Sequence, residues 1–340
     1  MENKNLIEVN DLKVSFFTPA GEVKAVGGIS YKIKYNEVMG IVGESGSGKS
    51  VEAYSIMGLL QSPGKVTDGE IIFEGKNILN NSPKEMEAFR GNEAGMIFQN
   101  PMTCLNPVYT IGNQMMEGLL CHNKVNKSEA FDKACQMLNL VGIANPEKRM
   151  KQYPHELSGG MRQRVMIGMA LICEPKLLIA DEPTTALDVT IQAQILELIK
   201  DIQKKTKMSV IFITHNLAVV AKICDTVGVM YAGKMVEQGS VDDIFYNPMH
   251  PYTHGLLRSM PRIDEEETER LQSIEGSPVD MLNPPEGCGF CQRCPYSMKL
   301  CLRRSPPVLE IGEGHTVSCW LHALKREDGE YASKILMEVC

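Results

Sequence analysis

Residues 37–60 read EVMGIVGESGSGKSVEAYSIMGLL, and this stretch decides the fold. An apolar run typical of a buried strand leads into a glycine-rich turn, and helix-compatible sequence follows it. The turn fits G-x-x-x-x-G-K-[ST] in the strand-to-helix context that this motif requires, which disfavours a chance glycine-rich turn. Its backbone N–H groups can turn inward onto phosphate oxygens beside the positive end of the helix. We therefore expect a nucleotide's phosphates to bind to Gly43, Glu44, Ser45, Gly46, Ser47, Gly48, Lys49 and Ser50.

Two acidic residues farther along the chain extend this prediction to hydrolysis. The run LLIADE at 177–182 reads as a buried strand that delivers Asp181 and Glu182 to its carboxyl end. Asp181 and the Ser50 hydroxyl can hold Mg²⁺, and Lys49 offers a point charge to the β- and γ-phosphates. Glu182 can polarise an attacking water as a general base. Paired acids at a strand end are often only solvated turn residues, but the phosphate-binding motif upstream favours the catalytic interpretation.

Strands and helices alternate along most of the chain, which predicts an α/β domain with a largely parallel core sheet. Segments 6–17 and 23–33 read as two early strands, and residues 101–172 have a helical pattern with apolar positions three and four apart. After residue 247 proline, glycine and cysteine become frequent. We therefore expect a main domain over 1–255 and a small C-terminal extension over 256–340.

Composition disfavours several classes of protein. The 340 residues include 42 acidic and 35 basic side chains, a net charge of −7, which disfavours a nucleic-acid binder. No apolar run is long enough for a transmembrane helix, and the N-terminus lacks the basic and apolar regions of a signal peptide. We expect a cytosolic protein whose membrane role, if it has one, comes through partners.

The sequence LSGGMRQR at 157–164 carries a family resemblance. With the two motifs above, it makes residues 1–255 similar to the ATP-binding cassette ATPases. The resemblance implies a RecA-like P-loop core with an antiparallel β subdomain and a helical subdomain. It also implies that Ser158, Gly159 and Gly160 begin a helix and bind, in trans, the ATP held by a second subunit.

Other elements of that family follow in order along the chain. Gln99 in IFQN is implied to contact the metal and the water and to report them to the transport channel. Asp188 in TALD would lie across the dimer seam, and His215 in FITHN would contact the γ-phosphate. Phe16 or Phe17 stands where the family stacks adenine, although either ring could instead be core. Because the chain has one set of motifs, it needs a partner ATPase to complete a site.

Three further segments resemble one branch of this family, the oligopeptide/dipeptide importers. They are FQNPMTCLNPVYTIGNQ at 98–114, NPMHPYTHGLLRSMP at 247–261 and EGSPVDMLNPPEGCGF at 275–290. The branch implies a peripheral protein on the cytoplasmic face of the membrane, with a second ATPase subunit, two permeases and an extracytoplasmic peptide-binding protein as partners. Cys104 in place of serine and the additional Cys291 depart from the pattern, and neither affects hydrolysis.

Two alternatives remain open. A cassette ATPase acting on ribosomes or DNA usually has two cassettes or a long coiled-coil insertion, and this sequence has neither. The cargo could be a nickel chelate, a glutathione-like peptide or an oligosaccharide, because an ATPase subunit does not touch it. The sequence also leaves open whether the ATPase pair is a homodimer or a heterodimer.

Eleven cysteines fall into two groups. Cytosolic thiols stay mostly reduced, so we expect metal ligands rather than disulfides where cysteines cluster. Free thiols in a poorly ordered tail are the alternative, and four thiolates suit zinc as well as an iron–sulfur cluster. The family resemblance implies a structural [4Fe–4S] cluster on Cys288, Cys294, Cys301 and Cys319, with Cys291 spare, whereas ferredoxin-like spacing would use Cys291. The other six, expected to be small hydrophobic residues or idle thiols, are Cys104, Cys121, Cys135, Cys173, Cys224 and Cys340.

Overall fold

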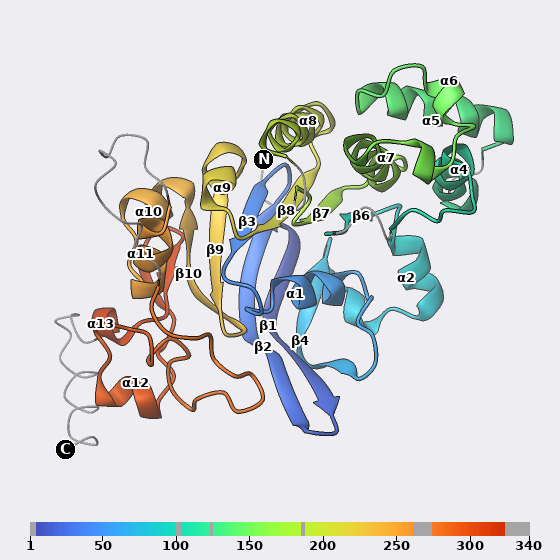
Figure 1. Ribbon diagram of the computed structural model, residues 1–340. Coiled ribbons are helices and arrows are strands. Elements are labelled where there is room, and N and C mark those ends of the chain that lie inside the picture. The colour runs from blue at the N-terminus through green and yellow to red at the C-terminus, as the bar shows by residue number, and fades with distance from the viewer. Residues whose placement is uncertain (1–4, 100–103, 123–124, 185–187, 261–273, 324–340) are drawn as a thin grey trace, which may run out of the picture. The chain divides into compact units, whose positions relative to one another are not determined.

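The computed structural model describes residues 5–99, 104–122, 125–184, 188–260 and 274–323 (Figure 1). The chain forms two compact units. The first unit contains residues 1–7, 33–38 and 73–213, and the second contains residues 8–32, 39–72 and 214–340. Each unit is described by itself below.

Three parallel strands form the centre of the first unit. Strand β7 (Leu177–Asp181) pairs with β6 (Ala94–Ile97) on one side and with β8 (Ser209–Thr214) on the other. Every residue of these strands is buried, which explains why they read as continuous apolar runs without alternation. The prediction of a parallel core is confirmed here.

Helices make up most of the rest of the first unit, and their caps follow from sequence. Asn126 caps α5 by accepting a hydrogen bond from the Glu129 N–H, and Ser82 and Glu85 form a capping box on α2. Helices α4, α5, α6 and α7 lie within the region where the sequence has a helical pattern, and Figure 1 shows them in teal to green. The elements are β5 (Lys76–Asn77), α2 (Pro83–Phe89), α4 (Ile111–His122), α5 (Lys127–Leu140), α6 (Pro146–Arg149), α7 (Gly159–Leu171) and α8 (Val189–Thr206), with 3₁₀ turns at Ile78–Asn80 and Pro154–Glu156.

Two groups of strands form the second unit. Long strands β1 (Asn5–Thr18) and β2 (Gly21–Lys34) are neighbours joined by two residues, a link that only an antiparallel pair can use, and β4 (Gly64–Phe73) lies beside β1. The other group has the order β3 (Val38–Val42), β9 (Thr226–Tyr231), β10 (Lys234–Ser240), β12 (His315–Val317) and β11 (Leu309–Gly312). Only the β3–β9 pair is parallel.

The C-terminal extension therefore adds strands to an existing sheet. Val317 of β12 lies opposite Glu237 of β10, so residues beyond 255 continue the hydrogen-bonded ladder of residues before 255. The domain boundary near residue 255 stays a prediction. The helices here are α1 (Lys49–Ile56), α9 (Leu217–Ile223), α10 (Val241–Tyr246), α11 (Pro251–Arg258), α12 (Lys299–Arg303) and α13 (Trp320–Ala323).

Helix α1 ends earlier than the helix-compatible sequence, which runs on to Leu60. Its last residue is Ile56, and Gly58 two positions later has a φ of 60°. A left-handed glycine just past a helix end stops the helix because its backbone turns away. Among the described residues, no helix is both long and apolar enough to cross a bilayer.

Candidate functional site

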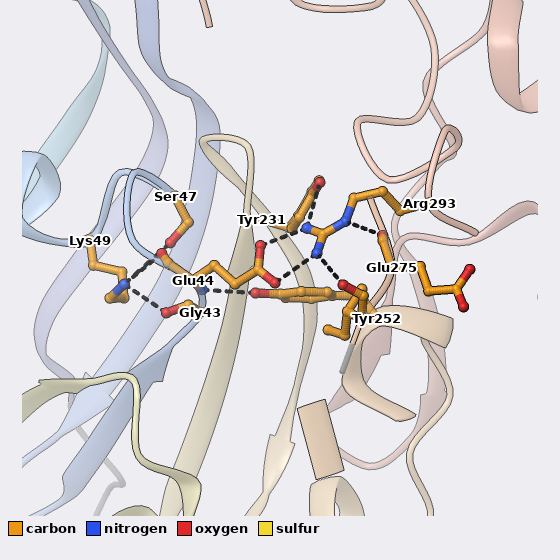
Figure 2. Close-up of polar contacts among 9 residues, drawn as sticks. Gly43, Glu44, Ser47, Lys49, Tyr231, Tyr252, Glu275 and Arg293 are labelled. Carbon is orange, nitrogen blue, oxygen red and sulfur yellow. Dashed lines mark hydrogen bonds and ion pairs between the residues drawn. The ribbon is translucent and has the colours of Figure 1, made fainter. Parts of the chain in front are cut away.

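Lys49 of the second unit lies folded over the loop that precedes α1, as Figure 2 shows. Its ammonium group donates hydrogen bonds to the carbonyl oxygens of Gly43, at 2.8 Å, and Glu44, at 2.9 Å. The Ser47 hydroxyl is 3.4 Å from the same nitrogen. A positive charge that is 5% exposed is thus held in place inside the loop Gly43–Ser50.

The loop is packed tightly on its inner side and open on its outer side. A Cβ on Gly43 would lie 2.1 Å from the Met230 carbonyl oxygen, and one on Gly48 would lie 2.5 Å from the Ala25 carbonyl oxygen. A Cβ on Gly46, where φ is 80°, would meet nothing within 4 Å, and Ser45 and Gly46 are exposed. Backbone N–H groups at the start of an eight-residue helix, a held ammonium and an open side together suit an anion such as a nucleotide phosphate.

The acidic pair of the first unit lies at the end of β7. Asp181 is 0% exposed, and Glu182 follows it with a φ of 45°. The Glu182 N–H donates to the Ile213 carbonyl oxygen at 2.9 Å, and the Gln99 side-chain amide donates to the Glu182 carboxylate at 2.9 Å. A glutamate rarely adopts a left-handed backbone without a reason, and such positions cluster at functional sites. The structure brings Gln99 and Glu182 into direct contact.

Two helix starts in the same unit hold other predicted site residues. Ser158 caps α7 through a 3.4 Å bond from the Met161 N–H, and Asp188 caps α8 through a 3.0 Å bond from the Ile191 N–H. Gly159 has open space where a Cβ would be, whereas a Cβ on Gly160 would contact Ile191 at 3.3 Å. Both caps are exposed, so they face solvent in the single chain.

Sequence reasoning missed Gln163 of α7. Its side-chain amide donates to the Pro183 carbonyl oxygen, one residue after Glu182, and the side chain is 1% exposed. This bond ties the helix that Ser158 begins to the turn that holds Glu182. Gln163 lies within LSGGMRQR and could have been singled out from that motif. The sequence does not indicate that its side chain contacts the Pro183 carbonyl oxygen, which is 20 residues away.

The remaining predicted nucleotide contacts belong to the second unit. His215 is exposed directly after β8. Phe16 is half-buried, and its ring leaves no room for a Cβ on Gly64, which would lie 2.7 Å away. Phe17 is 49% exposed, so its ring is the more accessible of the two candidates for stacking. Gln99, Asp181, Glu182, Ser158–Gly160 and Asp188 lie in the first unit, so the two groups of site residues are described separately.

The described cysteines of the extension line one pocket in the second unit. The enclosed volume is about 20 Å³, and Phe290, Tyr296, Trp320 and His250 also line it. The Cys288 N–H donates to the Cys301 carbonyl oxygen at 2.7 Å. Residue 287 must be glycine for this approach, because a Cβ there would lie 2.0 Å from that oxygen. The five thiols on the pocket wall are those of Cys288, Cys291, Cys294, Cys301 and Cys319.

These five thiols are free of disulfide bonds. Burial raises the pKa of Cys288 to about 12 and that of Cys319 to about 11. No described cysteine forms a disulfide; Cys340 lies outside the described residues. No group of described histidine, cysteine or acidic side chains is arranged around a single metal ion. Soft thiol donors line one largely apolar pocket and are of the type that thiolate-bound metals prefer, although the described residues do not place them in the arrangement of a metal site.

Comparison with known proteins identifies the family. Residues 26–185 match the family model described as ABC transporter, and residues 236–301 match the model described as oligopeptide/dipeptide transporter, C-terminal region. The chain is 55% identical to the oligopeptide transport ATP-binding protein OppD of Bacillus subtilis over 93% of its own length and 88% of that protein's. The chain belongs to the ATP-binding proteins of oligopeptide/dipeptide ABC transporters. The resemblance expected from the sequence is confirmed.

Other similarities agree with membership of this transporter family. The dipeptide transport ATP-binding protein DppD of the same organism is 55% identical, covering 95% of this chain and 97% of that one. The solved structure of cbiO1 from Clostridium perfringens, part of an ABC transporter complex, is similar with a TM-score of 0.61 at 30% identity, over 72% of this chain and 91% of that one. The ATP-binding cassette MJ0796 bound to ADP and phosphate shares the fold, with a TM-score of 0.63 at 24% identity over 69% and 98%.

Proposed function

We propose that the chain hydrolyses ATP as the energy-coupling subunit of an importer for oligopeptides or dipeptides. The observation that carries the proposal is the contact between Gln99 and Glu182 beside the buried Asp181. Glu182 is partly exposed, so water can reach its carboxylate, as a general base requires. Family membership at 55% identity supports the activity and the class of cargo.

In this mechanism the loop Gly43–Ser50 binds the phosphates through its backbone N–H groups and Lys49. Asp181, Ser50 and Gln99 would hold Mg²⁺, which neutralises charge on the phosphates when bound. Glu182 takes a proton from the attacking water. The water oxygen forms a bond to the γ-phosphorus, and the bond between that phosphorus and the bridging oxygen of the β-phosphate breaks. His215 would contact the γ-phosphate, and Phe16 or the more exposed Phe17 would stack on adenine.

A second ATPase subunit is part of the proposal. Ser158 and Gly159 are exposed at the start of α7, where they could contact a nucleotide bound to another chain. Asp188 is exposed at the start of α8, where it could lie at the interface with that chain. Two permeases and an extracytoplasmic peptide-binding protein complete the assembly, with this chain peripheral on the cytoplasmic face. Nickel chelates, glutathione-like peptides and oligosaccharides remain alternative cargoes.

The catalytic proposal is tested by Glu182→Gln in the assembled transporter. ATP binding should persist while hydrolysis at this site falls by roughly two to four decades, the usual effect of losing a positioned base. Glu147→Gln, at an exposed position of α6, is the matched control and should leave turnover unchanged. Turnover that survives in the Glu182 variant would remove this residue from the role of base.

We further propose a structural metal centre in the cysteine pocket. Cys288, Cys294, Cys301 and Cys319 would hold a [4Fe–4S] cluster, with Cys291 spare, and zinc is the alternative. The support is that all of these thiols line one pocket. A segment with little core of its own gains stability from such a centre.

Anaerobically purified protein should then contain about four irons per chain and absorb broadly in the visible range. One tightly bound zinc in a colourless preparation would exclude the cluster and retain the ligand set. Loss of the metal in Cys291→Ser together with its retention in Cys319→Ser would favour the ferredoxin-like spacing.

A further inference from the structure

We call residues 287–301 the cysteine segment. Its Arg293 contacts the loop Gly43–Ser50 directly (Figure 2). It lies between Cys291 and Cys294, and its guanidinium donates two parallel bonds to the Glu44 carboxylate, at 2.6 Å and 3.0 Å. The Arg293 side chain is 5% exposed and the Glu44 side chain 27%. A two-pronged pair of this kind fixes orientation as well as distance, and a lysine could not reproduce it.

The rest of the guanidinium is also fixed. Its Nε donates to the Glu275 carbonyl oxygen at 2.9 Å, and one terminal nitrogen donates to the Ile274 carbonyl oxygen at 3.1 Å. The other terminal nitrogen lies 3.3 Å from the Tyr231 hydroxyl, and the group stacks 5.8 Å from the centre of that ring. Arg293 therefore has one position available, and that position determines where the Glu44 side chain lies.

The main chain of Glu44 is fixed from the same side. Its N–H donates to the Tyr252 hydroxyl at 2.8 Å, and its carbonyl oxygen accepts from the Lys49 ammonium at 2.9 Å. Lys49 is the residue that we propose to bind the β- and γ-phosphates. One residue of the loop thus connects the phosphate-binding lysine to two side chains that follow residue 250.

Aromatic packing joins these side chains to the cysteine segment. The rings of Tyr231 and Tyr252 lie 4.6 Å apart, and Phe290 packs against them at 5.2 Å and 5.3 Å. Tyr252 is 0% exposed and Phe290 2%. The turn that holds Arg293 is therefore held by Phe290, two residues after Cys288.

We propose that Arg293 is a positioning residue for nucleotide binding, so that the loop's affinity for ATP depends on the folded state of turn 287–294. The inference rests on the proposed role of Gly43–Ser50 as the phosphate site. Its electrostatic reason is that a carboxylate in a loop that binds phosphates repels them unless a cation neutralises it, and Arg293 is that cation. Because two sites coupled in free energy affect each other equally, ATP should in turn stabilise the turn.

The test measures equilibrium binding of Mg-ATP to the full chain, purified without its partners. Arg293→Met should raise the dissociation constant about tenfold, within the 5- to 150-fold range usual for coupled sites. Arg293→Lys should recover part of the affinity, because it restores the charge without the second bond. Glu44→Gln combined with Arg293→Met should bind ATP more tightly than Arg293→Met alone, because the carboxylate that Arg293 neutralises is then absent. Arg303→Met on α12, an exposed arginine of the same C-terminal extension, is the control and should bind like the unmodified chain.

A second measurement separates coupling from mere stabilisation of the fold. ATP should slow amide hydrogen exchange in residues 287–294 of the unmodified chain and of the Arg303 variant, and this protection should vanish in Arg293→Met. If Arg293→Met does not fold, Arg293→Lys and Glu44→Gln provide the same comparison.

Two failures can be told apart. Unchanged affinity in Arg293→Met and Glu44→Gln, in a chain whose Lys49→Ala variant loses ATP, would refute the positioning role and leave the proposed function intact. An unmodified chain that binds ATP no better than Lys49→Ala would refute both.

Discussion

Gly46 and Gly48 of the loop Gly43–Ser50 offer a matched pair of substitutions. Both have a left-handed backbone, with φ values of 80° and 99°. They differ in their surroundings, because a Cβ on Gly46 meets nothing within 4 Å and a Cβ on Gly48 would lie 2.5 Å from the Ala25 carbonyl oxygen. Replacing each with alanine therefore separates backbone strain from steric overlap.

The expected loss of stability follows from three contributions. Alanine in a left-handed conformation costs about 1–2 kcal/mol, and the smaller freedom of the unfolded chain returns about 0.4–1 kcal/mol. Gly46→Ala should therefore destabilise the chain by about 1 kcal/mol. Gly48→Ala adds an overpacking cost of about 1–3 kcal/mol, because its neighbour is backbone in β2 and cannot rotate away. Its total should be about 3 kcal/mol.

The measurement is denaturant unfolding of the full chain without nucleotide, comparing midpoints at an unchanged slope. Equal midpoints for the two variants, or a larger loss for Gly46→Ala, would refute the assignment of the extra cost to close packing. For nucleotide binding, Gly46→Ala is the informative variant. Gly46→Ala should weaken ATP binding although it destabilises the chain less than Gly48→Ala, because its Cβ enters the open side of the loop. Normal ATP binding by this variant would show that the phosphates lie elsewhere.

The other predictions concern helix caps, the aromatic anchor and assembly. Asp188→Ala removes a 3.0 Å cap from α8 and should cost about 1–2 kcal/mol in denaturant unfolding, whereas Ser158→Ala removes a 3.4 Å cap and should cost about 0.5 kcal/mol; the reverse order would contradict the cap geometry. Phe290→Ala deletes a ring that is 2% exposed and should cost about 3–5 kcal/mol locally, measured as faster hydrogen exchange in residues 287–301; unchanged exchange would mean that the ring does not anchor the turn. The isolated chain should hydrolyse ATP slowly and gain activity with a partner ATPase and permeases, so rapid turnover by a monomer would argue against a site shared between chains.

The sequence predicted those parts of the site whose chemistry is local. The strand, turn and helix around Gly43–Ser50 follow from one motif. The position of the acidic pair follows from the apolar run before it, because charged residues mark the end of a buried strand. In each case the residues that interact are near in the chain, so spacing carries the information. The structure adds two short-range contacts that the motifs did not predict, the helix caps at Ser158 and Asp188.

Other features depend on contacts that spacing does not encode. Strands β11 and β12 have four and three residues, too few for an alternating pattern, and β12 forms because β10 offers an edge. Alternation places Phe16 and Phe17 on opposite faces of β1 but does not say which face is covered. In the structure Gly64 packs against the Phe16 ring, so the face that carries Phe16 is the covered one. Arg293 and Glu44 are 249 positions apart, and neither the cysteine spacing nor the phosphate-binding motif gives any reason to pair them.

The Glu44 contacts also restrict the conformations of a glycine-rich loop. Three glycines in eight residues leave many backbone conformations open. A loop that becomes ordered only on binding loses conformational entropy at that step, and this cost lowers its affinity. Here one end of the loop is held by hydrogen bonds from Arg293 and to Tyr252, and Lys49 is held by the carbonyl oxygens of Gly43 and Glu44. Ser45 and Gly46 remain exposed between these fixed points. These contacts limit the conformations open to the loop, and the C-terminal extension contributes to them through Arg293.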